Sequence, residues 1–153
     1  MNWCYRCIKR LSTNLFGVCM EKIDYKKELE HLYKHTANKV GVVEVPQMNF
    51  LIIDGEGCPN TSRSFQDAIE QVGSKKDSRF LTLLTFESFA ERKATQIMHI
   101  GPFSEEGPTV KKFHTFIDDS GCKRTGKHHE IYLSDILRSA PKKLRMILRQ
   151  PML

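Results

Sequence analysis

One order of elements occurs twice along this sequence: a strand, a short break, a second strand, a glycine-containing turn and a helix. In the first copy the turn contains Gly55, and in the second copy the corresponding turn contains Gly101. Two copies of such a unit usually pack as pseudo-symmetric halves of one sheet, because neither copy can bury its apolar face alone. The repeat therefore predicts an α+β domain that consists of two related modules.

Strand and turn signals give the boundaries of the two modules. The first module, at about residues 40–72, contains strands at 40–45 and 49–54 and a helix that ends near residue 72. A polar junction at about 72–80 leads to the second module, which contains strands at 80–89 and 94–100, a helix from Pro108 to about Gly121, and a strand at 128–134. The first module has no equivalent of this last strand, so we expect it to be incomplete.

Helices are predicted on both sides of the repeat. Apolar residues recur at helical spacing over residues 25–33, among charged residues. At the other end, Pro141 suits the first turn of a helix over residues 139–149, and Leu144, Ile147 and Leu148 would form its apolar face. Residues 1–19 precede the pattern, and we interpret them as an extension to a domain over residues 20–153, with Met20 as the natural start.

Length and charge exclude several classes of protein. With 153 residues the chain has room for one domain of ordinary size. Its formal net charge of +6 comes from lysine and arginine residues spread along the chain, a pattern typical of solvated surfaces. The most basic segment, residues 142–149, lacks aromatic side chains on which bases could stack. Nucleic-acid binding is therefore not expected.

The cysteines indicate a reducing compartment. Three of the five, Cys4, Cys7 and Cys19, lie in the first 19 residues, and this is not a disulfide framework. Cys4 and Cys7 form a C-x-x-C pair, but no second pair follows to complete a zinc site. The apolar run at residues 11–16 is interrupted by polar residues and is too short to cross a membrane. We expect a cytoplasmic protein with no metal, cofactor or membrane contact.

Glu130 is the position at which the sequence most clearly suggests chemistry. An unpaired carboxylate is costly to bury, so its place on an apolar strand points to a function. If residues 128–134 are extended, His128, Glu130 and Tyr132 share one face, which resembles the wall of a pocket. The alternative is a carboxylate at the rim that pairs with Lys127 or a histidine. His128 and His129 would point to opposite faces, so they cannot bind one metal ion together.

Two other motifs are interpreted as structural. The glycine-containing turns at Gly55 and Gly101 lack the spacing of a phosphate-binding loop. Glu105 and Glu106 precede Pro108, at the expected start of a helix, where negative charge is favourable. We therefore assign no role in binding to these two turns or to these two glutamates.

Four stretches resemble the GyrI-like small-molecule-binding domain proteins. The segments that carry the resemblance are residues 25–34, 49–57, 96–102 and 126–135, the last two reading QIMHIGP and GKHHEIYLSD. The resemblance implies paired strand-helix-strand-strand modules that form a curved antiparallel sheet with helices on one face. It also implies a cleft between the two halves that holds a ligand, with the glutamate at Glu130 in contact with it.

The sequence departs from this family in its first module. Family members continue from the first helix into two further strands, with tryptophans that line the cleft. This sequence lacks that part, and its only tryptophan is Trp3. The resemblance therefore implies an internal deletion that removes part of the cleft wall.

We therefore predict that the chain binds small amphipathic or cationic molecules. Glu130 would contact the ligand, with Tyr132 as an aromatic wall and Met98 or Phe50 as apolar lining. Related domains serve in multidrug-responsive regulators, and some resemble hydrolases that open cyclopropane rings of toxic natural products. In a hydrolase Glu130 would be the catalytic base, with its pKa raised by an apolar cleft, but the missing wall favours binding over catalysis. A third hypothesis is a remnant without function, or one that works only as a homodimer through exposed sheet edges.

Overall fold

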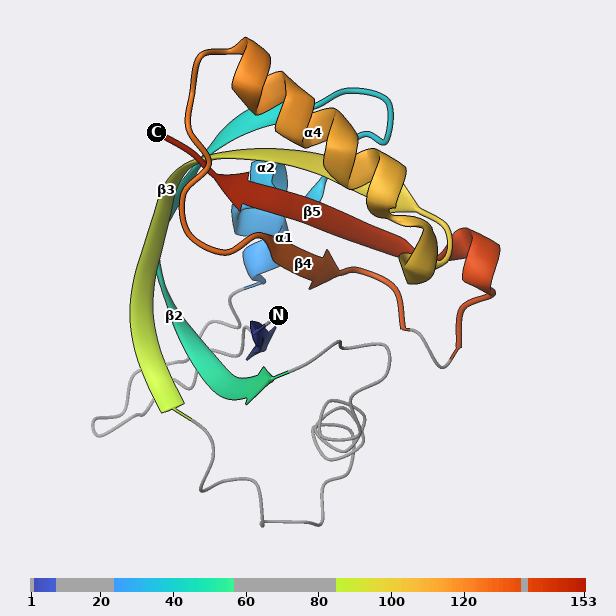
Figure 1. Cartoon of the computed structure of the whole chain (residues 1–153). Coiled ribbons are helices and arrows are strands. Elements are labelled where there is room, and N and C mark those ends of the chain that lie inside the picture. Colours follow the sequence, from blue (N-terminus) through green and yellow to red (C-terminus); the bar gives the residue numbers. More distant parts are fainter. Residues whose placement is uncertain (1, 8–23, 57–84, 136–137) are drawn as a thin grey trace, which may run out of the picture. The chain divides into compact units, whose positions relative to one another are not determined.

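The computed structural model describes residues 2–7, 24–56, 85–135 and 138–153 (Figure 1). In these described residues, five strands form one sheet in the order β1-β2-β3-β5-β4. The strands are β1 (Asn2–Cys7), β2 (Gly41–Glu56), β3 (Thr85–Ile100), β4 (His129–Tyr132) and β5 (Arg145–Pro151). The pairs β1–β2, β3–β5 and β4–β5 are antiparallel. The α+β class and the curved antiparallel sheet are confirmed.

The chain divides into two compact units, and the first comprises Met1–Cys19 and Gln47–Phe89. In its described part, β1 pairs with the second half of β2, from Asn2 opposite Glu56 to Cys7 opposite Leu51. Phe50 and Ile52 of β2 are buried. The sequence analysis treated residues 1–19 as an extension outside the domain pattern, and it did not predict that Asn2–Cys7 form a strand of the sheet.

The second unit comprises Met20–Pro46 and Ala90–Leu153 and contains the main core. One face of its strands carries Ile97 of β3 and Met146 and Leu148 of β5, which are completely buried. Helix α4 (Gly107–Asp119) covers this face through Phe113 and Ile117 (Figure 1). Burying these side chains supplies much of the stabilisation of this unit, at about 25 cal/mol per Å² of apolar surface.

Helix α4 forms where the sequence predicts a helix. Pro108 occupies its first turn, where a missing N–H costs nothing. The helix ends at Asp119, and the chain then turns at Gly121, whose φ of +69° suits a residue without a side chain. A short 3-10 helix, η2 (Phe103–Glu105), directly precedes it.

The opposite face of the same strands contacts the short helix α2 (Glu30–Tyr33). The side chains of Gln96 and Arg149 donate hydrogen bonds to the backbone carbonyls of His31 and Leu32. The predicted helix at residues 25–33 is divided into α1 (Tyr25–Glu28) and α2, because Leu29 leaves the helical conformation with φ −108° and ψ 43°. Helix α4 therefore covers one face of these strands, and the single turn of α2 lies on the opposite face.

Three element assignments were wrong. The separate strands expected at 80–89 and 94–100 form one continuous strand, β3, over the described residues. Pro46 was expected to separate two strands, but β2 is continuous through this exposed position. The helix expected at residues 139–149 is a 3-10 turn, η3 (Pro141–Lys143), followed by β5. Its apolar residues fit helical spacing, but β5 is buried on both faces, so consecutive side chains are covered whichever way they point. The helix predicted to end near residue 72, the junction at 72–80 and the start of the next strand lie outside the described residues.

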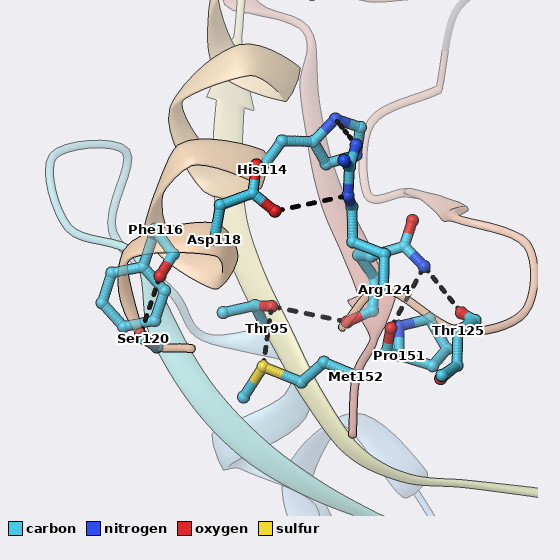
Figure 2. Close-up of polar contacts among 10 residues, drawn as sticks. Thr95, His114, Phe116, Asp118, Ser120, Arg124, Thr125, Pro151 and Met152 are labelled. Atoms are coloured by element: carbon cyan, nitrogen blue, oxygen red, sulfur yellow. Dashed lines mark hydrogen bonds and ion pairs between the residues drawn. The ribbon is translucent and has the colours of Figure 1, made fainter. Parts of the chain in front are cut away.

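The loop between α4 and β4 is fixed by contacts of Arg124, and Figure 2 shows those of its side chain with His114 and Asp118. The Arg124 guanidinium donates to Nδ1 of His114 at 3.2 Å and lies 3.7 Å from a carboxylate oxygen of Asp118. The Arg124 backbone also forms a bridge with Met152. These contacts hold the segment that leads into β4 against α4 and the end of β5.

None of the helices in the described residues is long and apolar enough to cross a membrane.

Candidate functional site

Glu130 and Tyr132 of β4 point toward the α4 side of the sheet. Glu130 lies opposite Leu148, and Tyr132 lies opposite Met146, and both partners face the core under α4. The Tyr132 hydroxyl donates a hydrogen bond to Oε2 of Glu130. Nε2 of His128 lies 3.7 Å from the other carboxylate oxygen. The alternation predicted from the sequence therefore does bring these three side chains together.

A second carboxylate joins this group from a different segment. Glu106 is the residue before α4, and its side chain makes no capping hydrogen bond to the helix. Single ligand atoms of Glu106, His128 and Glu130 all lie within 4.8 Å of one another. Oε2 of Glu106 is buried and has no hydrogen-bond partner among the described residues. We call Glu106, His128, Glu130 and Tyr132 the carboxylate site.

His99 holds the start of α4 in place. The ring is buried, and Nε2 donates to the carbonyl of Pro102 at 3.0 Å, while Nδ1 lies 3.1 Å from the Thr109 hydroxyl. A neutral ring with its proton on Nε2 satisfies both contacts, since a carbonyl oxygen only accepts. His99 thus ties η2 to the first turn of α4 and fixes the backbone that carries Glu106.

Two aromatic rings form the apolar part of the site. Phe103 of η2 packs against Tyr132 with ring centroids 4.9 Å apart and planes tilted by 55°. This is a favourable geometry for two aromatic rings. The carboxylates therefore lie beside an aromatic surface.

The two carboxylates of the site differ in pKa. Burial, and next the negative charge of Glu130, raise the pKa of Glu106 to about 7, although His128 opposes this. Burial alone would raise the pKa of Glu130 too, but contacts with His128 and Tyr132 outweigh it and lower the pKa. The pKa of His128 is raised, chiefly by its contact with Glu130. The sequence analysis expected the raised pKa at Glu130, whereas it belongs to Glu106.

These differences give each residue a distinct capacity near neutral pH. Glu130 is ionised and attracts positive charge. Glu106 is poised between its acid and base forms, as suits a group that transfers protons. Glu106, His128 and Glu130 also form a set of oxygen and imidazole donors that a divalent cation can use. The sequence did not indicate this set, because Glu106 is in a different element.

Of the four residues predicted to contact ligand, the structure brings Glu130 and Tyr132 together. Met98 lies opposite Ile147 and faces the other side of the sheet, so it was wrongly grouped with Glu130. Its neighbours in β3, Ile97 and His99, face the carboxylate side. Phe50 belongs to the first unit, where it is buried.

The carboxylate site lies in the part of the chain that resembles known proteins. Residues 83–150 match the family model of the GyrI-like small molecule binding domain. A solved structure titled as a hydrolase from Listeria innocua is 27% identical, with a TM-score of 0.72, and the match covers 86% of this chain and 100% of that chain. An uncharacterized conserved protein from Listeria innocua is 26% identical, with a TM-score of 0.72 and the same coverage.

A further Listeria innocua structure, also titled a hydrolase, is 25% identical, with a TM-score of 0.70, and the match covers 87% of this chain and all of that one. No curated protein matches the chain. The similarity therefore associates this chain with small-molecule-binding domains.

Proposed function

We propose that this chain, which is GyrI-like over residues 83–150, binds amphipathic small molecules that carry a cationic group, and that the carboxylate site receives this group. The observation that supports the proposal most strongly is the ionised carboxylate of Glu130 beside a second carboxylate with a pKa of about 7. A ligand cation would add a favourable charge interaction to those that His128 and Tyr132 already provide for Glu130.

The neighbouring aromatic rings suit the apolar part of such a ligand. Phe103 and Tyr132 are partly buried against the core under α4. Cations next to aromatic faces gain about 0.5–2 kcal/mol, depending on how far they are removed from water. A lipophilic cation would therefore use the rings and the carboxylate together.

Calorimetric titration with tetraphenylphosphonium tests the proposal. The wild-type chain should bind this cation, and Glu130→Gln, which keeps the shape of the side chain and removes its charge, should weaken binding by about 10-fold to 100-fold. Glu105→Gln is the matched control, because Glu105 is an exposed glutamate in η2, next to Glu106. Chelator in all samples keeps adventitious divalent cations from competing.

Equal affinity of Glu130→Gln and the wild type for tetraphenylphosphonium would exclude Glu130 as the cation-binding group. Equal losses in Glu105→Gln and Glu130→Gln would indicate a general charge effect instead of a site. Circular dichroism of each variant separates both outcomes from a loss of folding.

Hydrolysis is the second candidate function. Glu130 is ionised, and Glu106 has a pKa of about 7. A carboxylate oxygen of one lies within 4.8 Å of a carboxylate oxygen of the other, so one group can orient water while the other transfers a proton. Two of the similar solved structures are titled hydrolases. Opening a strained cyclopropane would add the hydroxyl of water to one ring carbon and a proton to the other.

Turnover of a cyclopropane-bearing electrophile, followed by mass spectrometry, tests this candidate. Glu106→Gln and Glu130→Gln should each lower kcat by about 10²-fold to 10⁴-fold, the range for loss of acid–base catalysis. Glu105→Gln should leave turnover unchanged. Retained binding with no turnover in the wild type would limit the protein to binding.

Several finer predictions from the sequence remain proposals. They are a range of multidrug ligands, a cytoplasmic location, a first module shortened by deletion, and a homodimer through sheet edges. Among the strands that the structure describes, β1 and β4 lie at the two ends of the strand order, and we propose these edges for the pairing. Light scattering in solution distinguishes a homodimer from a monomer.

A further inference from the structure

A hollow lies on the face of the sheet opposite the carboxylate site. Its volume is about 550 Å³, within the range of small-molecule pockets. The lining comes from three parts of the second unit: the end of α2 and the residues after it, β3, and the segments around the β4–β5 connection. The lining residues are Tyr33, Lys34, His35, Thr36, Met98, Leu133, Ser134, Lys143 and Arg145.

The register of the strands places this hollow away from Glu130. Met98 lies opposite Ile147, and Ile147 lies opposite Ile131 of β4, so these side chains point to the face that α2 contacts. Arg145, opposite Ile100, faces the same way. Glu130 and Tyr132 face the other way, so the hollow is separate from the carboxylate site.

The charge of the lining is one-sided. Lys34, His35, Lys143 and Arg145 line the hollow, and no acidic side chain of the described residues does so. Lys34, the residue that follows α2, pairs with Glu30 at the start of that helix. In the described part of the chain, neither Lys143 nor Arg145 takes part in an ion pair. Two cations that have no ion-pair partner among the described residues therefore border the hollow.

The backbone around the hollow is fixed by hydrogen bonds. The N–H of Arg145 donates to the Ser134 hydroxyl at 3.0 Å, and the N–H of Leu133 donates to the Arg145 carbonyl at 3.0 Å. On the other side, the N–H of Met98 donates to the Thr36 carbonyl at 3.3 Å. The basic side chains therefore project from a backbone that need not rearrange when a ligand binds.

We propose that this hollow is a binding site for a small organic anion whose oxyanion group contacts Lys143 and Arg145 and whose apolar part packs on Met98 and Leu133. Arginine binds carboxylate and phosphate in a two-pronged geometry, and lysine adds a point charge. Met98 is adaptable in shape and forms a buried apolar floor. The proposal does not depend on the function of the carboxylate site.

Three probes with the same ring test the proposal and identify the oxyanion. Phenyl phosphate, benzoate and the uncharged benzyl alcohol are titrated into protein labelled at the methionine methyl groups, and binding is followed by NMR. The Met98 signal should shift with one or both anions and much less with benzyl alcohol. The signal of Met146, buried on the α4 face, should not move. Binding of phenyl phosphate alone would identify a phosphate ester as the ligand class, and equal binding of benzoate would widen the class to carboxylates.

Variants of two neighbouring lysines provide the matched comparison. Lys143→Gln and Arg145→Gln should each weaken the Kd of the bound anion about 3-fold to 10-fold, since each removes one cation. Lys142→Gln removes the same charge from the same 3-10 turn but from a residue that does not line the hollow, so its Kd should stay within about twofold. Glu130→Gln should bind the anion as the wild type does.

The inference is wrong if none of the probes shifts Met98, or if benzyl alcohol shifts it as strongly as the anions. It is also wrong if Lys143→Gln binds the anion as tightly as Lys142→Gln. Because Lys143 is exposed, its variant should fold normally, and it decides the outcome even if Arg145→Gln does not fold.

Discussion

At the scale of single residues, the carboxylate site depends on how Glu106, His128 and Glu130 share their protons. The pKa of Glu130 is lowered and the pKa of His128 is raised, so these two residues compensate one another when both are charged. Glu106, with a pKa of about 7, is neutral below that value and negative above it. The site is therefore close to neutral in acid and becomes negative as the pH rises.

This charge balance predicts that cations bind more tightly as the pH rises. Between about pH 6 and pH 8, Glu106 loses a proton, and this change adds negative charge to the site. The Kd of tetraphenylphosphonium should fall about tenfold over this interval, measured by calorimetric titration in a series of buffers. By linkage, binding near neutral pH should release protons.

Glu106→Gln is the control for this pH dependence. It cannot ionise, so the variant should show a flatter profile than the wild type, while Glu105→Gln should retain the wild-type slope. An affinity that is independent of pH, or that falls as the pH rises, would contradict the assigned charge states.

The sequence could predict Glu130 and Tyr132 but not Glu106. Side chains two residues apart on a strand share a face, so the alternation in residues 128–134 was enough to group His128, Glu130 and Tyr132. Glu106 reaches them from before α4, and only tertiary packing brings it there. A glutamate before a proline at a helix start is commonly structural, so nothing local distinguished its role.

At the scale of elements, the buried strand β5 explains why a helix was wrongly predicted at residues 139–149, and its burial contributes to the stability of the second unit. Its residues Met146 to Pro151 are buried, between β3 on one side and β4 on the other. A short run of apolar residues in such a strand cannot be distinguished from a buried helix by periodicity. Helix α4, amphipathic and begun by a proline, was predicted correctly because both of its signals are local.

Arg149 of β5 is buried within a polar group. It donates to the Gln96 side chain and to the Leu32 carbonyl at 3.0 Å, and its guanidinium lies 3.6 Å from the Glu91 carboxylate. His129 of β4 lies 2.8 Å from the same carboxylate. These contacts connect β3, β4, β5 and α2 on the face opposite α4.

Arg149→Met should therefore destabilise the protein strongly. The substitution keeps much of the apolar stem but leaves the Glu91 carboxylate buried without its arginine, at a cost of about 3–5 kcal/mol. Urea unfolding followed by circular dichroism measures the loss. Arg145→Met is the matched control, because Arg145 is exposed on the same strand, and it should change stability by no more than about 0.5 kcal/mol. Similar losses in both variants would show that the buried contacts of Arg149 contribute little.

At the scale of the whole molecule, the second unit has opposite charge character on its two faces. The carboxylate site lies on the side of α4, and the basic hollow lies on the side of α2. The repeat predicted two modules that share one sheet, and the family resemblance implied that the sheet is antiparallel. Neither indicated this division, because the charged residues of both sites come from separate segments. Met98, grouped with Glu130 from the sequence, belongs to the second face.

The central claim is that the Glu130 carboxylate binds the positive charge of a ligand. It is tested most directly by comparing tetraphenylphosphonium with triphenylphosphine oxide, which is uncharged, in the wild type and in Glu130→Gln. The wild type should prefer the cation by about tenfold or more, and the variant should lose that preference while its affinity for the neutral compound is unchanged. If the preference for the cation is the same in both proteins, Glu130 does not recognise the charge and the account is wrong.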